Sequence, residues 1–164
     1  MGVKLRRARN SDSEGVIALI ACVFAEYEGC VLDVDLEEPE LRTPAGSFTR
    51  FWVLEHAGEI VGCGGLVDHG PGGVELKKLY LDSDVRGRGH AREIAGLIEE
   101  YAVAVGAPWI ELWSDTRFLA AHGFYEKCGY RRTGRTRDLN DLSNTTEYHY
   151  EKRLDPDMIR VSPE

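Results

Sequence analysis

Apolar positions along the chain follow two different periods. Three segments show helical spacing, Val16 to Tyr27, Ile94 to Val105 and Phe118 to Cys128, and each is expected to bury one face of a helix. Short apolar runs with the length of buried strands lie between them, the clearest at Val74 to Leu81 and Trp109 to Trp113. The alternation of the two patterns predicts an α/β fold.

The middle of the chain predicts the type of sheet. Phe51 to Glu55 and Glu59 to Val67 are separated by a short turn and are expected to form an antiparallel hairpin that leads into Val74 to Leu81. Because a helical segment separates Val74 to Leu81 from Trp109 to Trp113, these two strands are expected to be parallel neighbours. The second hairpin strand should contain a bulge or a close backbone contact, because it carries Gly62, Gly64 and Gly65.

The two ends of the chain complete this arrangement. A first strand is expected at Val3 to Arg9, and Ser11-Asp-Ser-Glu14 has the pattern of a capping box that opens the first helix. Two final strands are expected at about Tyr130 to Arg137 and Thr145 to Leu154. The sequence therefore predicts one domain with a mixed, mostly antiparallel sheet, a central parallel strand pair and flanking helices.

Composition narrows the class of protein. The chain has 164 residues, enough for one domain, which we expect at residues 1–155 with a tail at 156–164. The formal net charge of −8 argues against a nucleic-acid partner. The four cysteines contain no Cys-x-x-Cys pair, which indicates buried thiols in a reducing compartment, the cytoplasm. No signal peptide or apolar run of membrane length is present, so no membrane partner is expected.

The strand that ends at Leu81 is followed by a glycine-rich turn and a helix. Gly87 and Gly89 lie in this turn, and the helix is expected to begin near Gly89. A helix N-terminus presents unpaired N–H groups at the positive end of the helix dipole, and glycines allow an anion to approach the backbone. Further positive charge comes from Arg86, Arg88 and Arg92. We therefore expect this turn to bind a phosphate-bearing ligand.

Two common phosphate motifs do not fit this turn. No Lys-Ser/Thr pair follows it, and Arg92 stands where a dinucleotide fingerprint has its third glycine. The segment Arg86-Gly-Arg-Gly-His-Ala91 instead resembles the pyrophosphate motif Gln/Arg-x-x-Gly-x-Gly/Ala of the GCN5-related N-acetyltransferases. Phe124 to Tyr130 resembles that family's Phe-Tyr-x-x-x-Gly-Phe/Tyr, with Ala121 at its alanine position. Phe118 departs from the family, which often has Asn there.

This resemblance implies that acetyl-CoA is the acetyl donor and that the chain has the family's fold. The pyrophosphate is then expected at the backbone of the turn, formed by Arg86, Gly87, Arg88, Gly89, His90 and Ala91. The pantetheine arm is expected to lie beside the central strand like an added strand, along Leu79, Tyr80 and Leu81.

Tyr125 resembles the family tyrosine that protonates the departing CoA thiolate. A phenol with an ordinary pKa of about 10 is protonated at neutral pH and can donate to a thiolate. The alternative is a purely structural aromatic residue, because Tyr125 lies on the apolar stripe of its helix.

Glu75 is the first candidate for the general base. It lies eleven residues before Arg86, the spacing at which some relatives place a catalytic glutamate, and strand alternation predicts that it shares a face with Leu79 and Leu81. The alternative is a glutamate paired with Lys77 on that face. Two reserves lie on and after the neighbouring strand, Glu111 and Asp115.

The resemblance implies an N-acetyltransferase that moves an acetyl group to a primary amine of a small molecule or peptide by direct attack in a ternary complex. Cys128 is not expected as a nucleophile, because it lies on an apolar stripe with no paired histidine.

A non-catalytic acyl-CoA-binding sensor or interaction module is the alternative function. No metal is expected. The loops at 33–48 and 138–144 should select the acceptor, whose identity stays open, as does a homodimer of the kind common among relatives.

Overall fold

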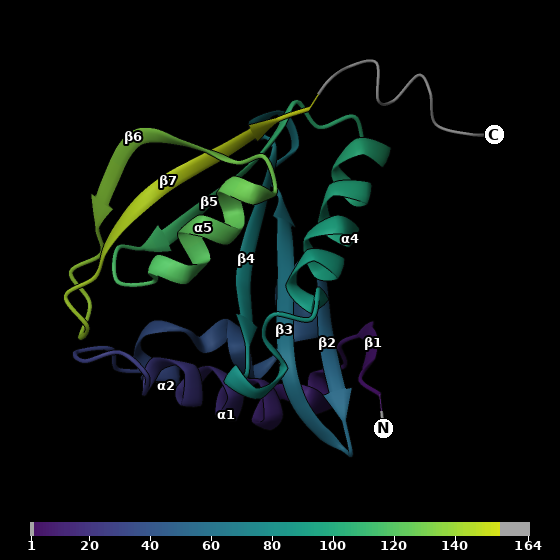
Figure 1. Ribbon diagram of the computed structural model, residues 1–164, viewed down its shortest axis with the longest axis vertical. Coiled ribbons are helices and arrows are strands. Elements are labelled where there is room, and N and C mark those ends of the chain that lie inside the picture. The colour runs from purple at the N-terminus through teal and green to yellow at the C-terminus, as the bar shows by residue number, and fades with distance from the viewer. Residues whose placement is uncertain (1, 155–164) are drawn as a thin grey trace.

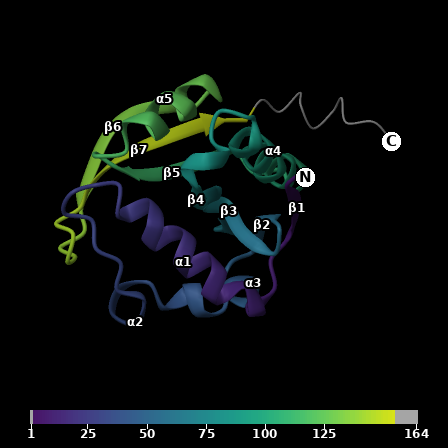
Figure 2. The ribbon, with the colours of Figure 1, turned by 60° about the horizontal axis from the view of Figure 1, so that its bottom comes forward.

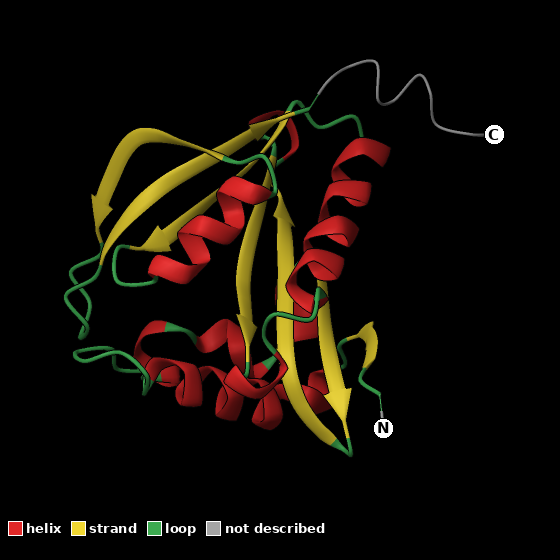
Figure 3. Ribbon diagram, viewed as in Figure 1, coloured by secondary structure: helices red, strands yellow, loops and turns green. Residues whose placement is uncertain are grey.

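The computed structural model describes residues 2–154 as a seven-stranded sheet with helices on both faces (Figures 1 and 3). The strand order is β1-β2-β3-β4-β5-β7-β6. The strands are β1 (Lys4–Arg7), β2 (Arg50–His56), β3 (Glu59–Asp68), β4 (Val74–Leu81), β5 (Trp109–Asp115), β6 (Arg131–Asp138) and β7 (Thr146–Arg153). The α-helices are α1 (Ser13–Phe24), α2 (Val34–Glu37), α3 (Pro44–Ser47), α4 (His90–Ala104) and α5 (Leu119–Lys127). The tail expected at 156–164 lies outside the described residues.

The sheet is mostly antiparallel, and β4 and β5 form its parallel pair, so the predicted fold class is confirmed. This parallel pairing is short, since it joins only Val74 to Ile110 and Glu75 to Glu111. Beyond these pairs the two strands diverge (Figure 1). The edge of β4 that faces β5 is therefore unpaired from Leu76 onward, and a cleft opens between the strands.

The two faces of the sheet carry separate hydrophobic cores. Helices α4 and α5 lie on one face and α1 lies on the other (Figure 2). On the α4 side, Ile94 and Ile98 are fully buried together with Leu76 of β4. On the α1 side, Val16 and Ile20 are fully buried in the second cluster. Both cores therefore hold β4 in place. Separately, none of the helices in residues 2–154 has the length and apolar content to cross a bilayer.

The glycines of β3 behave as the sequence predicts. The pairing of β3 with β4 shifts between Cys63 and Gly65, which is the expected irregularity. A Cβ added at Gly64 would lie 2.7 Å from Ile94 of α4, so the helix packs closely against this strand.

The predicted capping box at the start of the first helix is wrong. A 3-10 turn at Asn10–Asp12 precedes α1, and Asp12 accepts the backbone N–H of Arg9 at 2.8 Å. The same carboxylate receives two hydrogen bonds from the Arg6 guanidinium, at 2.8 and 2.9 Å. These hydrogen bonds from Arg6 lower the pKa of Asp12. The cap is therefore Asp12, and its carboxylate is held by Arg6 of β1, a residue that the capping-box pattern does not include.

Candidate functional site

A cavity of about 690 Å³ opens where β4 and β5 diverge. Its walls come from β4, the glycine turn, the ends of β5 and α1, helix α5, and two loops that follow α1 and β6. The cavity contains eight of the residues expected at the site: Glu75, Leu79, Tyr80, Leu81, Arg86, Gly87, Ala91 and Tyr125. Arg88 and Gly89 of the adjoining turn and His90, the first residue of α4, do not line the cavity.

A bulge in β4 changes which side chains face which side of the sheet. Lys78 has a φ of +60°, and the pairing with β3 shifts at this point. Leu79 therefore packs in the α4-side core together with Leu76, whereas Tyr80 packs in the α1-side core. Glu75 precedes the bulge and is paired with Val67 of the α1-side core. The expectation that Glu75 shares a face with Leu79 is thus wrong, because regular alternation stops at Lys78.

The bulge also directs Lys78 toward the segment after α2. Its ammonium group forms an ion pair with Glu38 and lies 3.6 Å from Glu40. The Lys78 carbonyl accepts a hydrogen bond from the Cys63 thiol at 3.1 Å. These contacts hold the irregular part of β4 from both neighbouring segments.

Glu75 is paired with a histidine and not with Lys77, the partner given by the alternative interpretation. Its Oε1 atom lies 2.9 Å from Nε2 of His69, and its side chain is 14% exposed. Glu111, its register partner on β5, is hydrogen-bonded to His149 at 2.7 Å and does not line the cavity. Of the two reserves, only Asp115 lines the cavity.

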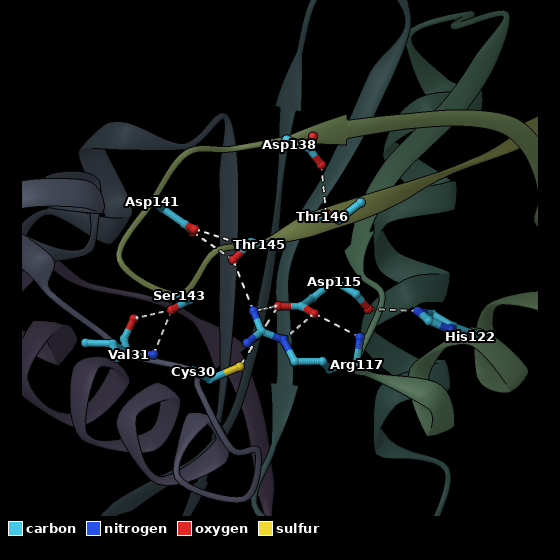
Figure 4. Close-up of polar contacts among 10 residues, drawn as sticks. All are labelled: Cys30, Val31, Asp115, Arg117, His122, Asp138, Asp141, Ser143, Thr145 and Thr146. Atoms are coloured by element: carbon cyan, nitrogen blue, oxygen red, sulfur yellow. Dashed lines mark hydrogen bonds and ion pairs between the residues drawn. The ribbon is translucent and has the colours of Figure 1, made fainter.

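Asp115 is the centre of a polar network beside the cavity, which it also lines (Figure 4). Its carboxylate accepts two hydrogen bonds from the Arg117 guanidinium, each at 2.9 Å. Arg117 also reaches Thr145, which donates to Asp141 at 2.8 Å. With its carboxylate held by Arg117, Asp115 is better suited to shaping the loop than to accepting a proton.

Ser143 ties the loop between β6 and β7 to the segment that follows α1. Its hydroxyl accepts the N–H of Val31 at 2.7 Å and donates to the Val31 carbonyl at 3.1 Å (Figure 4). The Leu142 N–H donates to Glu37 at 2.8 Å. The two loops expected to select the acceptor therefore meet at one edge of the cavity.

Tyr125 lies on α5, packs its ring in the core and lines the cavity. It is 6% exposed, and its ring lies 5.9 Å from that of Tyr130 and 6.0 Å from that of Tyr150. Within residues 2–154 its hydroxyl makes no hydrogen bond. Burial raises the pKa of Tyr125, so the phenol stays protonated across the neutral range.

The glycine turn has the geometry of an anion site. Gly87 and Gly89 have φ values of +78° and +88°, and an added Cβ at either position would meet no atom within 4 Å. Helix α4 begins directly afterwards at His90. The backbone is therefore open to a ligand next to the N-terminus of a long helix.

An aromatic wall that the sequence does not reveal lies beside the cleft. The rings of Tyr27 and Phe118 are 4.7 Å apart, and Phe24 and Tyr80 lie within 6.3 Å of Phe118. Helical spacing places Phe24 and Tyr27 on a buried face, but only the fold brings them to Phe118. Phe118, where the family often has Asn, thus closes the α1 side of the cavity.

Comparison with known proteins agrees with this geometry. Residues 16–130 match the acetyltransferase (GNAT) family. The N-acetylaspartate synthetase of Danio rerio is 32% identical over 117 residues, which cover 71% of this chain and 42% of that protein. The chain therefore spans about two fifths of the length of this curated relative.

Two solved structures share the fold. A GNAT-family acetyltransferase from Staphylococcus aureus Mu50 superposes with a TM-score of 0.80 at 19% identity, over 94% of this chain and 100% of the other. The PaiA N-acetyltransferase of Thermoplasma acidophilum, solved in complex with coenzyme A, gives a TM-score of 0.68 at 15% identity, over 94% and 100% of the two chains. The family match extends from α1 through the divergent strands and the glycine turn to the end of α5. By this match, the chain belongs to the acetyltransferase (GNAT) family.

Proposed function

We propose that this protein is an acetyl-CoA-dependent N-acetyltransferase that acts on a primary amine. One observation carries the proposal: the unpaired edge of β4, Gly87 of the open glycine turn and Tyr125 line a single cavity. Membership of the family and the coenzyme A complex of the Thermoplasma acidophilum relative support the same donor. The four free cysteines support the cytoplasm as its compartment.

The donor fits the described residues in two parts. We assign the pyrophosphate to the backbone N–H groups of the turn at Gly87 to Ala91, where α4 begins. We assign the pantetheine arm to the edge of β4 from Leu79 to Leu81, which β5 leaves unpaired. The thioester would then lie near Tyr125, at the inner end of the cavity.

The reaction follows from these positions. The neutral amine attacks the thioester carbonyl, a C–N bond forms, and the C–S bond breaks. Glu75, directly or through water, takes the proton that converts the ammonium form of the acceptor into this neutral amine. The Tyr125 hydroxyl gives a proton to the departing thiolate, and the second proton that the amine nitrogen loses goes to solvent. The products are the acetylated amine and free CoA, and the tyrosine recovers its proton from solvent.

Replacing Glu75 by Gln is expected to lower kcat by about 10²-fold, with the greatest loss at low pH. At high pH more of the acceptor is already neutral, so the base contributes less. A pH–rate profile of thiol release checks this. Glu111→Gln is the matched control, because Glu111 is the register partner of Glu75 but does not line the cavity. Equal losses at every pH would assign Glu75 a structural role.

The charges of the cavity favour a cationic acceptor. Seven carboxylates and four cationic side chains line it. The carboxylates are Glu37, Glu38, Glu40, Glu75, Asp115, Asp141 and Glu147, and the cations are Lys77, Lys78, Arg86 and Arg137. Because Lys78 is shared between Glu38 and Glu40, negative charge remains in excess on the acceptor side.

We therefore expect a polyamine to be acetylated with a kcat/KM at least about tenfold above that of L-aspartate, the acceptor suggested by the name of the Danio rerio relative. A lysine-containing peptide completes the panel, and thiol release measures each rate. Preferential use of L-aspartate would contradict the charge argument and point to Lys77 and Arg137 as carboxylate ligands.

Calorimetric titration with acetyl-CoA, with ATP and NAD as controls, tests the proposal as a whole. Saturable binding of acetyl-CoA alone, followed by thiol release with an amine, is the expected result. Binding without turnover on any amine would favour the non-catalytic sensor. Absence of binding would contradict the assignment of the glycine turn.

A further inference from the structure

The side chain of Arg86 is committed to protein contacts. Its Nε and Nη2 atoms donate to the Leu81 carbonyl at 3.1 and 2.9 Å. Its Nη1 and Nη2 atoms donate to the two carboxylate oxygens of Glu26 at 2.7 and 2.8 Å. This is the bidentate geometry in which a guanidinium binds a carboxylate most specifically. The hydrogen bonds with Glu26 raise the pKa of Arg86, so it is charged throughout the accessible pH range.

These contacts join three elements around the donor site. Leu81 is the last residue of β4, Arg86 directly precedes Gly87, and Glu26 lies just after the end of α1. From Ser83 to Gly89 only Val85 is buried, so few side chains restrain this turn. The Arg86 bridge is therefore a main restraint on the backbone that carries the open N–H groups.

We propose that Glu26 is a positioning residue for acetyl-CoA, acting through Arg86 on the glycine turn. The inference rests on the proposed function, because it concerns the affinity of the same donor site. Without Glu26, the guanidinium keeps only its contact with Leu81, and the turn must be ordered when the ligand binds. The ordering cost then appears as weaker binding.

The opposite role for Arg86 predicts the opposite sign. If Arg86 acted as a charge that contacts the pyrophosphate directly, Glu26 would compete with the ligand for it. Removing the Glu26 carboxylate would then strengthen acetyl-CoA binding. The direction of the change therefore separates a positioning role from a competing one.

The experiment compares Glu26→Gln with Glu28→Gln by calorimetric titration with acetyl-CoA. Glu28 is an exposed residue of the same segment, and no ion pair of residues 2–154 includes it. We expect Glu26→Gln to raise the Kd about two- to fivefold, since the ion pair is partly exposed, and Glu28→Gln to leave it unchanged. An unchanged or lower Kd for Glu26→Gln, or an equal rise for Glu28→Gln, would overturn the proposal.

Kinetics provide a readout that general destabilisation would not reproduce. Glu26→Gln should raise the KM for acetyl-CoA with little change in kcat, and Glu26→Asp should restore part of the affinity. Arg86→Lys should weaken binding by itself, and adding Glu26→Gln to it should cost little more, because the two residues form one unit. Additive losses would contradict this coupling. Absence of binding by the wild-type protein would instead overturn the proposed function.

Discussion

Tyr125→Phe is expected to lower kcat by about 10²- to 10⁴-fold, the range for loss of a general acid. Acetyl-CoA affinity should change little, because the ring stays in place and the hydroxyl has no hydrogen bond within the described residues. Steady-state measurement of thiol release gives kcat, and calorimetric titration gives the Kd. Lost turnover with retained binding would show that the Tyr125 hydroxyl acts in the reaction and not in holding acetyl-CoA.

Tyr130→Phe is the matched control for this experiment. Tyr130 is also buried, at 5% exposure, and contacts the Tyr125 ring, but it does not line the cavity. Its loss of a hydroxyl should leave kcat nearly unchanged. Retained turnover in Tyr125→Phe would return Tyr125 to a structural role and leave thiolate protonation to water.

Gly89→Val is expected to weaken acetyl-CoA binding by at least about tenfold. Gly89 has a φ of +88°, and this conformation costs a residue with a Cβ roughly 1–2 kcal/mol. An added Cβ at this position would meet no protein atom within 4 Å, so the valine should not disturb the packing. It should instead strain the turn conformation and occupy the volume that a bound anion would take. Calorimetric titration with acetyl-CoA measures the change, and circular dichroism verifies that the fold is retained.

Gly96→Val provides the control in the same helix. Gly96 lies in α4, has no positive φ, and an added Cβ would meet no atom within 4 Å. Valine is tolerated in helices slightly better than glycine, so binding and stability should both be retained. Normal acetyl-CoA affinity in Gly89→Val would remove the phosphate-binding role from this turn.

The elements around the expected donor site could be predicted because their signals are local. The bounds Val74 to Leu81 agree with β4, and the helix expected near Gly89 begins at His90. Gly106, with a φ of +72°, follows the end of α4 and accounts for its clear termination. Each of these elements is determined by residues adjacent in sequence. The spacing of apolar residues and the positions of turn-forming residues are therefore sufficient to predict its bounds.

The side-chain directions in β4 could not be predicted from the sequence. The bulge at Lys78 lies opposite Gly64 of β3, and its contacts are made with the Cys63 thiol and with the carboxylates of Glu38 and Glu40. None of these residues is near Lys78 in sequence. An isolated strand pattern gives no reason to interrupt alternation at a lysine. The face assigned to Glu75 was therefore wrong, although its strand was correct.

The contact between Ser143 and Val31 shows that the two sides of the cavity are formed differently along the sequence. Residues 76–128 contain, in one uninterrupted stretch, the strand edge, the turn and the tyrosine assigned to the donor. The edge of the cavity expected to select the acceptor is instead formed by two loops far apart in sequence, since Val31 and Ser143 are separated by 112 residues. Exchange of one loop between relatives would leave its partner unmatched. We therefore expect a change of acceptor to require both loops to be replaced together. The elements expected to bind the donor lie in one stretch, apart from Glu26, which holds Arg86 from the segment after α1.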